Sequence, residues 1–469
     1  MIDGQPFPIG NFQGRPLSRH QRLSQAVWGS SVTGIVTAYD LLKRHDHVRL
    51  AVLAARDAAF FTPSRASRLG RKVLAIRPSL GLEFDLSGAL LETEMPGWHK
   101  MEMVQAKDCV KTHHIFNSED KRKINLTELS RLPGKASPNG KCVVLMAGIA
   151  NSTEAFFRIG TQVEEVGPPI LNRLLDRGFT VLIFDFPGLG KNENFIGKND
   201  IETAVTKLMP HVMKFLLRNP ELYPEGLYFL AHSMGGMVLN TFMAKFATDI
   251  KADPSLTELF KNKMTLGTPE IPLADAHALY PSVLAAIPVL APYLDDIPVD
   301  VIRRVPGRVI PYSTLIGGRG SMISFDPDYP PALVQEMFDF AVKRFSLGLA
   351  MMFVESFRNS HFPDLHKAPP IWVPGQRNVR LVTNKDPLAP VESLVGRMLE
   401  HEAIMRDRFS LWRIERDGSG IAEAVADIGV TPITGISVDD MSHLDIATPN
   451  QRFETCVWPI ILKFLQESA

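Results

Sequence analysis

The stretch AHSMGG places Ser233 between an apolar run and a pair of glycines. A serine between a strand and a helix, with small residues two positions before and two after it, is typical of a nucleophile elbow. Ala231 and Gly235 are small enough for strand and helix to approach closely, and the turn would aim the amide of Met234 at the space beside the serine hydroxyl. The alternative is an ordinary serine that caps a helix, and this motif alone does not decide between the two.

A catalytic serine needs a base, and the base needs an acid that orients it. His232 is a poor base, because neighbouring side chains on a sharp turn diverge and its ring is expected to pack beneath the turn. Where a serine is displayed at such an elbow, an acid and then a histidine follow it along the chain. Asp386, after the apolar run VRLVT, and His443, after the apolar run PITGIS, have this order. Because loops at the carboxyl ends of parallel strands converge, the sequence predicts that these residues meet.

Other residues compete for the roles of acid and base. Glu270, at the end of TLGTPE, is a second candidate for the acid, although the turn-rich loop around Asp386 favours the latter. Asp439 and Asp440 are too close to His443 in the chain to orient it easily. An aspartate beside a proline is often only a turn residue, and a single histidine among 13 is more often structural. The joint occurrence, in order and each after a strand, favours catalysis.

The elements that must position these residues alternate between strands and helices. Continuous apolar runs, expected of strands buried on both faces of a parallel sheet, occupy residues 142–147, 180–186, 227–231, 263–267 and 379–383. Residues 201–217 show helical spacing of apolar side chains behind Asp200 as N-cap, and Pro210 predicts a kink. Before the first run, HKMEMVQ and CVKTHHIF predict an antiparallel pair. The alternation predicts an α/β fold with a mostly parallel central sheet flanked by helices.

Four segments follow from this pattern. Residues 1–95 form an N-terminal extension that is predicted to be helical, and residues 96–270 form the first part of the core. The strand–helix alternation lapses in residues 271–370, which are rich in proline and apolar side chains and are too long for a connecting loop. They are predicted to be an inserted, largely helical cap. Residues 371–469 complete the core.

Six motifs lie in register along the chain: VVLMAGIANSTEAF, GFTVLIFDFPGLGKNEN, AHSMGG, TLGTP, TNKDPLAP and MSHLD. Together they resemble the α/β-hydrolase family, and within it the lysophospholipases, monoacylglycerol lipases and carboxylesterases. The resemblance covers residues 100–270 and 371–469. There are departures from the family pattern, since Ala147 replaces a loop histidine, Pro187 an arginine and Ala231 the first glycine of the elbow.

The resemblance implies acyl transfer through a covalent intermediate, without a metal or an organic cofactor. Ser233 would be the nucleophile, His443 the base and Asp386 the acid that holds it. The position that matches the family's oxyanion amide is Ile149, and the amide of Met234 would be the second donor. The predicted partner is a small-molecule acyl ester. The apolar cap favours a lipophilic acyl group, unless those side chains only pack the cap onto the core.

Two rival functions stay open at this point. The same Ser–His–Asp set would serve a thioesterase or an acyltransferase. A non-catalytic, hydrolase-like binding protein is the other rival, although a binder has no need of all three residues. A phosphate-binding loop at PGLGKN is rejected, because Asp185 stands where the first glycine should be and Asn192 where serine or threonine belongs.

The composition excludes several other classes of protein. The chain has 469 residues, of which 45% are apolar and 22% charged, as in soluble globular proteins. Lys+Arg and Asp+Glu both number 51, which gives no support for nucleic-acid binding. Three cysteines are too few and too scattered for a disulfide framework or a zinc site. With no secretory pattern and no apolar run of about 18 residues, a cytoplasmic protein is predicted. Peripheral membrane contact and the oligomeric state stay open.

Overall fold

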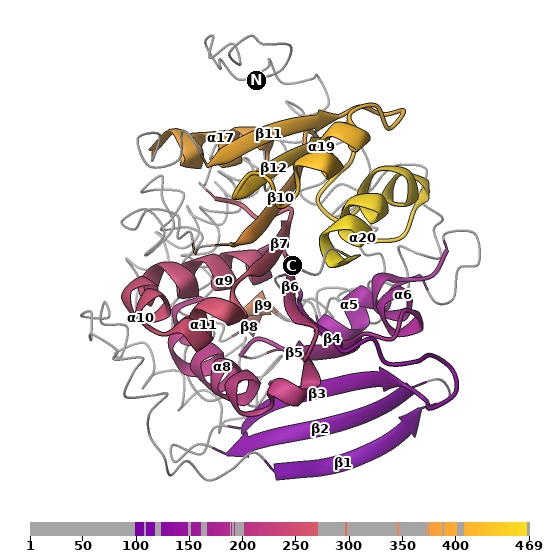
Figure 1. Cartoon of the computed structure of the whole chain (residues 1–469), viewed down its shortest axis with the longest axis vertical. Helices are drawn as coiled ribbons and strands as arrows, with labels where there is room; N and C mark the ends of the chain where they lie inside the picture. The colour runs from indigo at the N-terminus through magenta and orange to yellow at the C-terminus, as the bar shows by residue number, and fades with distance from the viewer. Residues whose placement is uncertain are drawn as a thin grey trace, which may run out of the picture.

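The computed structural model covers the core of the chain (Figure 1). It describes residues 99–106, 109–117, 123–148, 152–160, 167–187, 189, 192, 201–270, 296–297, 345–346, 373, 375–386, 389–400 and 408–466. The predicted N-terminal extension lies outside these residues. So does nearly all of the predicted cap, in which two short strands, β8 (Asp296–Ile297) and β9 (Phe345–Ser346), pair antiparallel with each other. Both parts stay predictions.

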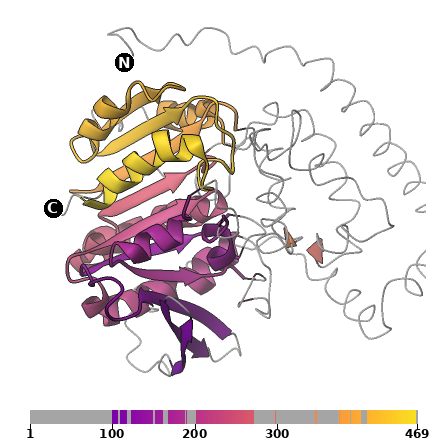
Figure 2. The ribbon, with the colours of Figure 1, turned by 90° about the vertical axis from the view of Figure 1, so that its right-hand side faces the viewer.

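A 10-stranded sheet forms the centre, with its strands in the order β1-β2-β3-β5-β4-β6-β7-β10-β12-β11. The strands are β1 (His99–Ala106), β2 (Cys109–Asn117), β3 (Lys123–Arg131), β4 (Lys141–Met146), β5 (Thr180–Phe184), β6 (Gly226–His232), β7 (Asn262–Leu266), β10 (Arg377–Thr383), β11 (Phe409–Ile414) and β12 (Ile433–Val438). Figure 2 shows them stacked from the indigo N-terminal edge to the orange C-terminal edge.

The type of strand pairing changes once across the sheet. From β5 to β11 every neighbouring pair is parallel, whereas β1, β2, β3 and β5 pair antiparallel. The predicted α/β fold with a mostly parallel sheet is therefore confirmed, as is the antiparallel pair at the N-terminal edge. The strands β3 and β11 were not predicted, because their polar and charged residues interrupt any apolar run.

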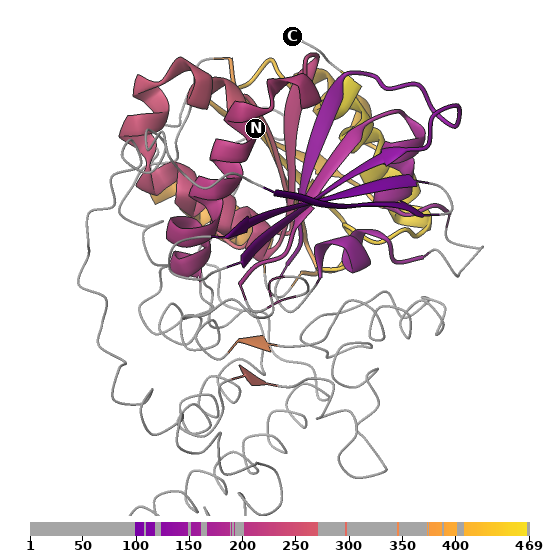
Figure 3. The same ribbon diagram turned by 90° about the horizontal axis from the view of Figure 1, so that it is seen from below.

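Helices cover both faces of the sheet (Figures 1 and 3). On one face lie α8 (Met209–Arg218), α9 (Met234–Lys245), α10 (Ala247–Ala252) and α11 (Pro254–Leu259). On the other lie α5 (Thr153–Phe157), α6 (Ile170–Asp176), α19 (Ile421–Asp427) and α20 (Trp458–Gln466). Near the C-terminal edge, α17 (Val391–Glu400) packs on β10. In the part of the chain that is described, no helix is long and apolar enough to span a membrane.

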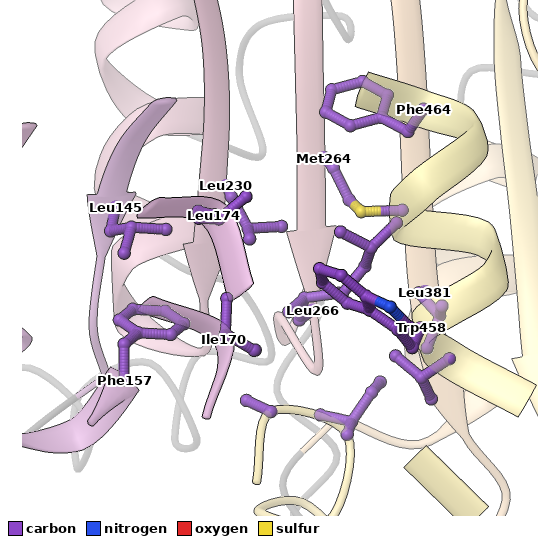
Figure 4. Close-up of a cluster of buried hydrophobic side chains, with 14 of the residues drawn as sticks. Leu145, Phe157, Ile170, Leu174, Leu230, Met264, Leu266, Leu381, Trp458 and Phe464 are labelled. Carbon is purple, nitrogen blue, oxygen red and sulfur yellow. The ribbon is translucent and has the colours of Figure 1, made fainter. Parts of the chain in front are cut away.

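Alternation along the strands builds two cores. On β4, Val143 and Leu145 join the core beneath α5, α6 and α20, and Val144 joins the core beneath α8 and α9. Figure 4 shows the first core, in which leucines of successive strands meet α6 and the aromatic rings of Trp458 and Phe464. Because successive side chains of a strand point to opposite faces, a strand covered on both sides must be apolar throughout. This is the physical origin of the continuous apolar runs.

The helix predicted over residues 201–217 is interrupted before Pro210. A short helix α7 (Ile201–Thr203) continues as a π-helical turn, η3 (Ala204–Leu208), and α8 begins at Met209. Proline lacks an amide hydrogen and fits the first turn of a helix, so the chain changes its hydrogen-bond pattern immediately before it. The last helix repeats the arrangement, since the π-helical turn η6 (Phe453–Val457) precedes Pro459 of α20.

Gly178 ends α6 and connects it to β5. Its φ is +80°, its amide donates to Leu175, and the amide of Phe179 donates to Leu174, which is the Schellman arrangement. A Cβ at Gly178 would lie 2.0 Å from the carbonyl oxygen of Ser137. Gly134 has a similar φ of +87°, but nothing lies within 4 Å of its Cβ position.

These two glycines separate conformational strain from steric overlap. Gly134→Ala should lower the free energy of unfolding by about 1–2 kcal/mol, because alanine resists the left-handed conformation. Gly178→Ala should lower the free energy of unfolding by about 1–3 kcal/mol more than Gly134→Ala does, because its methyl group overlaps backbone that must then move. Urea unfolding of both variants measures the difference, and equal losses would contradict the close approach at Ser137.

Candidate active site

Ser233 lies at a strained turn between β6 and α9. Its φ and ψ are 52° and −119°, a region that residues other than glycine rarely adopt. Its amide donates to the carbonyl oxygen of Leu266 at 2.8 Å, and its own carbonyl accepts from Thr268 Oγ1 at 3.2 Å. Both partners belong to β7 or to the loop that follows it, so the neighbouring strand holds the serine in this conformation.

The glycines after Ser233 are required by close packing. A Cβ at Gly235 would lie 2.6 Å from the carbonyl oxygen of Met146, and one at Gly236 would lie 2.0 Å from Thr268 Oγ1. The first turn of α9 therefore lies directly against the ends of β4 and β7. This is the physical reason why a serine at this elbow must be followed by small residues.

The structure brings Ser233, His443 and Asp386 together. His443 Nε2 lies 2.8 Å from Ser233 Oγ, and His443 Nδ1 lies 2.7 Å from Asp386 Oδ2. A carboxylate only accepts, so Nδ1 carries the hydrogen and Nε2 presents its lone pair to the serine hydroxyl. All three side chains are buried, with exposed fractions of 6% for Ser233 and 2% for the other two.

Parallel strands deliver the acid and the histidine. Asp386 follows β10 and His443 follows β12, which is the parallel neighbour of β10. The amide of Ala389 donates to Asp386 Oδ1 at 3.0 Å and fixes the carboxylate in its loop. In the histidine loop, the amide and hydroxyl of Ser442 both donate to Asp445 Oδ2. Each loop is thus held in shape by its own hydrogen bonds, independently of the contact between His443 and Asp386.

Two glycines leave space for these contacts. Both lie within the sequence motifs, but the sequence alone does not reveal this role. Gly267, in TLGTP, has a φ of +55°, and a Cβ there would lie 3.3 Å from both Asp386 Oδ2 and His443 Nδ1. A Cβ at Gly148 would lie 3.0 Å from the Cβ of Ser233. A side chain at either position would crowd Ser233, Asp386 or His443. No periodicity reveals this, because the requirement arises between segments distant in the chain.

The two predicted oxyanion donors differ in what the structure describes. Met234 is the first residue of α9, so its amide has no acceptor within the helix and lies beside Ser233. The partial positive charge of the helix N-terminus favours negative charge at the same place. Ile149 lies outside the described residues, and a Cβ on Gly148 before it would lie 3.0 Å from the Cβ of Ser233.

Asp185, in the motif FDFPGLG, anchors the start of α5, which follows the loop after β4. Its Oδ1 accepts from the amide of Thr153 at 2.7 Å, and Thr153 Oγ1 donates to the carbonyl of Phe184. Asn192 donates to the carbonyl of Asp185 at 2.5 Å. Of the two side chains that argued against a phosphate loop, Asp185 therefore ties the start of α5 to the end of β5, and Asn192 holds the loop after β5.

The competing acidic residues have other partners. Asp439 accepts from Arg413, and Asp440 pairs with Lys385. Glu270 is buried and forms an ion pair with Arg380 at 3.0 Å, and its Oε1 accepts from Asn240 at 3.1 Å. The carboxyl group at hydrogen-bonding distance from His443 is that of Asp386.

Lys263 belongs to the same buried cluster as Glu270. Its Nζ donates to Asn240 Oδ1 at 2.8 Å. Burial first, and then the nearby Arg380, lower the pKa of Lys263 to about 7, although Glu270 opposes the shift. The folded protein thus releases the lysine proton at a lower pH than the unfolded chain does.

Similarities with known proteins were found at the level of family and fold. A model of the alpha/beta hydrolase family matches residues 143–427. A search among curated proteins found no match. One similar solved structure is a soluble variant of monoglyceride lipase from Saccharomyces cerevisiae with a substrate analogue, at 12% identity and a TM-score of 0.43, covering 82% of this chain and 97% of that chain.

Two further structures are similar at low identity. An esterase from Pyrococcus furiosus has 15% identity and a TM-score of 0.36, with 80% of this chain and 97% of that chain covered. The peroxisomal alpha-beta-hydrolase Lpx1 from Saccharomyces cerevisiae has 13% identity and a TM-score of 0.37, with 74% and 82% covered.

The pKa of Lys263 predicts how stability depends on pH. Between pH 7 and pH 10.5 the unfolded chain holds a proton that the folded protein has released, so the free energy of unfolding rises with pH in this window. Lys263→Met removes the titrating group. Urea unfolding near both ends of the window should therefore show the wild type gaining stability relative to the variant as the pH rises. A difference that does not change with pH would contradict the lowered pKa.

Proposed function

The chain belongs to the alpha/beta hydrolase family, and we propose that it is a serine hydrolase that cleaves a carboxylic ester. The observation that carries the proposal is the position of His443, whose two ring nitrogens lie 2.8 Å from Ser233 Oγ and 2.7 Å from Asp386 Oδ2. The strained backbone of Ser233 supports it, because such strain clusters where a reactive group must be held out of its relaxed position.

The proposed reaction has two halves. His443 Nε2 takes the hydroxyl proton while Ser233 Oγ attacks the acyl carbonyl carbon, and Asp386 stabilises the imidazolium ion. The tetrahedral intermediate collapses, and the leaving alcohol takes the proton from His443. Water then attacks the acyl-enzyme, gives a proton to His443 and releases the acid, while Ser233 regains its hydrogen.

The amides of Met234 and Ile149 are proposed to stabilise the oxyanion of each tetrahedral intermediate. In other enzymes the loss of one such donor lowers the rate about 100–1000-fold. The position of Met234 at the start of α9 supports its role, since the helix N-terminus adds a favourable field. This mechanism requires neither a metal nor a cofactor.

For the substrate we propose an ester with a lipophilic acyl group. Residues 271–370, which follow β7 in the chain, are rich in Leu, Ile, Val, Phe and Pro. As a cap over the site they would offer an apolar lining to an acyl chain. The buried, free cysteines Cys109, Cys142 and Cys456 are compatible with the proposed cytoplasmic location.

A fluorophosphonate probe tests the proposed nucleophile. The probe should label the wild type once and leave Ser233→Ala unlabelled, because the probe traps a serine activated by a base. Ser419→Ala, in an exposed turn, is the matched control and should label like the wild type. Folded wild-type protein that does not label, or a Ser233→Ala variant that does, would refute the proposal. A panel of esters and thioesters with added alcohols then separates hydrolysis from acyl transfer.

A second pair of variants tests which carboxylate is the acid. Asp386→Asn should lower kcat about 10⁴-fold, because the amide no longer holds the correct tautomer of His443. Glu270→Gln should keep its labelling, yet lose about 3–5 kcal/mol of stability, since Arg380 loses its buried partner. Labelling kinetics and urea unfolding measure both effects. If Glu270→Gln lost the rate and Asp386→Asn kept it, Glu270 would be the acid.

A further inference from the structure

His232, the residue before the nucleophile, has a hydrogen bond that leads to the proposed base. It ends β6 and is fully buried. Its Nε2 lies 3.0 Å from the backbone carbonyl oxygen of His443. A carbonyl oxygen only accepts, so the hydrogen of the imidazole must be on Nε2.

The other ring nitrogen of His232, Nδ1, is buried and makes no hydrogen bond with the described residues. Burial first, and then the nearby His443, lower the pKa of His232 to about 3, so the ring is neutral and Nδ1 is a bare acceptor. A buried acceptor without a donor is unfavourable. A phenyl ring would fill the same space without that cost, and it would lack only the Nε2 hydrogen.

The packing of the ring leaves it little freedom. The ring stacks on Phe156 of α5, with centroids 4.8 Å apart and an interplanar angle of 23°. Its centroid lies 4.9 Å from that of the His443 ring. On the Nδ1 side, a Cβ at Gly148 would lie only 3.2 Å away. The direction of the Nε2–H group is therefore fixed by a strand, a helix and the loop after β4.

We propose that His232 is a positioning residue, which holds the backbone of His443 so that its ring reaches Ser233. The inference rests on the proposed function. Asp386 fixes the His443 ring through Nδ1, and His232 fixes the backbone carbonyl of the same residue. The two contacts link the base both to β10 and to β6. The second contact joins the histidine loop to the elbow without involving the hydroxyl and ring nitrogens of the proposed proton transfer.

The neutral state of His232 suits this role. Two imidazole rings at a centroid distance of 4.9 Å would compete for a proton if both could hold one. Because His232 does not accept a proton near neutral pH, the proton that leaves Ser233 stays on His443. His232 therefore donates one hydrogen bond and takes no part in the proton transfer.

Two substitutions separate positioning from packing. His232→Phe keeps the ring and its contact with Phe156, but loses the donor. His232→Gln keeps an N–H group that can reach the carbonyl of His443. We expect His232→Phe to lower the maximal rate of fluorophosphonate labelling, and kcat for p-nitrophenyl butyrate, about 10–100-fold, as a small misplacement of a reacting group does. The half-saturating concentrations should stay within about twofold, because ground-state binding is unaffected.

The stability of the variants distinguishes the two roles. His232→Phe removes one unpaired buried acceptor, Nδ1, and leaves another, the carbonyl oxygen of His443. Its thermal midpoint should therefore stay close to that of the wild type, whereas a purely structural histidine would lose stability together with activity. His232→Gln should recover most of the rate. His211→Phe is the matched control, since the His211 ring belongs to α8 and packs on Phe116 of β2, and it should leave the rate of labelling unchanged. A His232→Phe variant with the wild-type rate would overturn the proposal.

A measurement on the wild type keeps the test independent of folding and of catalysis. Nitrogen-15 spectra should show His232 as the neutral Nε2–H tautomer. The chemical shifts of its ring nitrogens should not change as the pH is raised through neutrality. An Nδ1–H tautomer, or a titration in that range, would overturn the inference even if His232→Phe fails to fold. Wild-type protein that is not labelled at Ser233 would instead refute the proposed function and leave the tautomer as the test of the contact.

Discussion

The strained conformation of Ser233 is the constraint on which the rest of the site depends. A residue with φ of 52° is unfavourable by about 1–3 kcal/mol and persists only where its surroundings leave no alternative. Here α9 lies so close to β4 and β7 that Gly235 and Gly236 have no space for a Cβ. The amide of Ser233 is also bound to Leu266 on the adjacent strand. A relaxed backbone would have to separate the helix from the sheet, and the core beneath α8 and α9 would be disrupted with it.

Once the serine is fixed, the order of the strands determines where its partners must come from. The strands β6, β7, β10 and β12 are consecutive neighbours and run parallel, so their carboxyl ends lie along one edge of the sheet. The loop after β7 carries Gly267, whose missing side chain leaves the space in which Asp386 meets His443. Residues 210 positions apart in the chain thus come within hydrogen-bonding distance, although each loop follows its own strand by only a few residues.

The sequence predicts the parts of this structure that local rules govern. Strands covered on both faces must be apolar throughout, so β4, β5, β6, β7 and β10 could be located from their composition. The order of Ser233, Asp386 and His443, each after a strand, led to the contacts that the structure describes. The strands β3 and β11 escaped prediction because their polar residues interrupt the apolar pattern. The roles of Gly148 and Gly267, and the bond from His232 to the backbone of His443, also escaped, because they depend on distances between segments that no local pattern encodes.

The choice between two carboxylates shows how the environment assigns a role that sequence position leaves open. Glu270 and Asp386 both follow strands of the same edge, and either could be aimed at a histidine from its place in the chain. The negative charge of Glu270 is balanced by Arg380 and shared with the amide of Asn240, within a cluster that also contains Lys263. The neighbouring cations largely cancel the negative charge of such a carboxylate. It would therefore stabilise an imidazolium ion elsewhere only weakly. Asp386 instead accepts an N–H bond from Ala389 through one oxygen and contacts His443 through the other. The buried cations beside Glu270 therefore determine, as much as the histidine loop does, which acid can serve the proposed base.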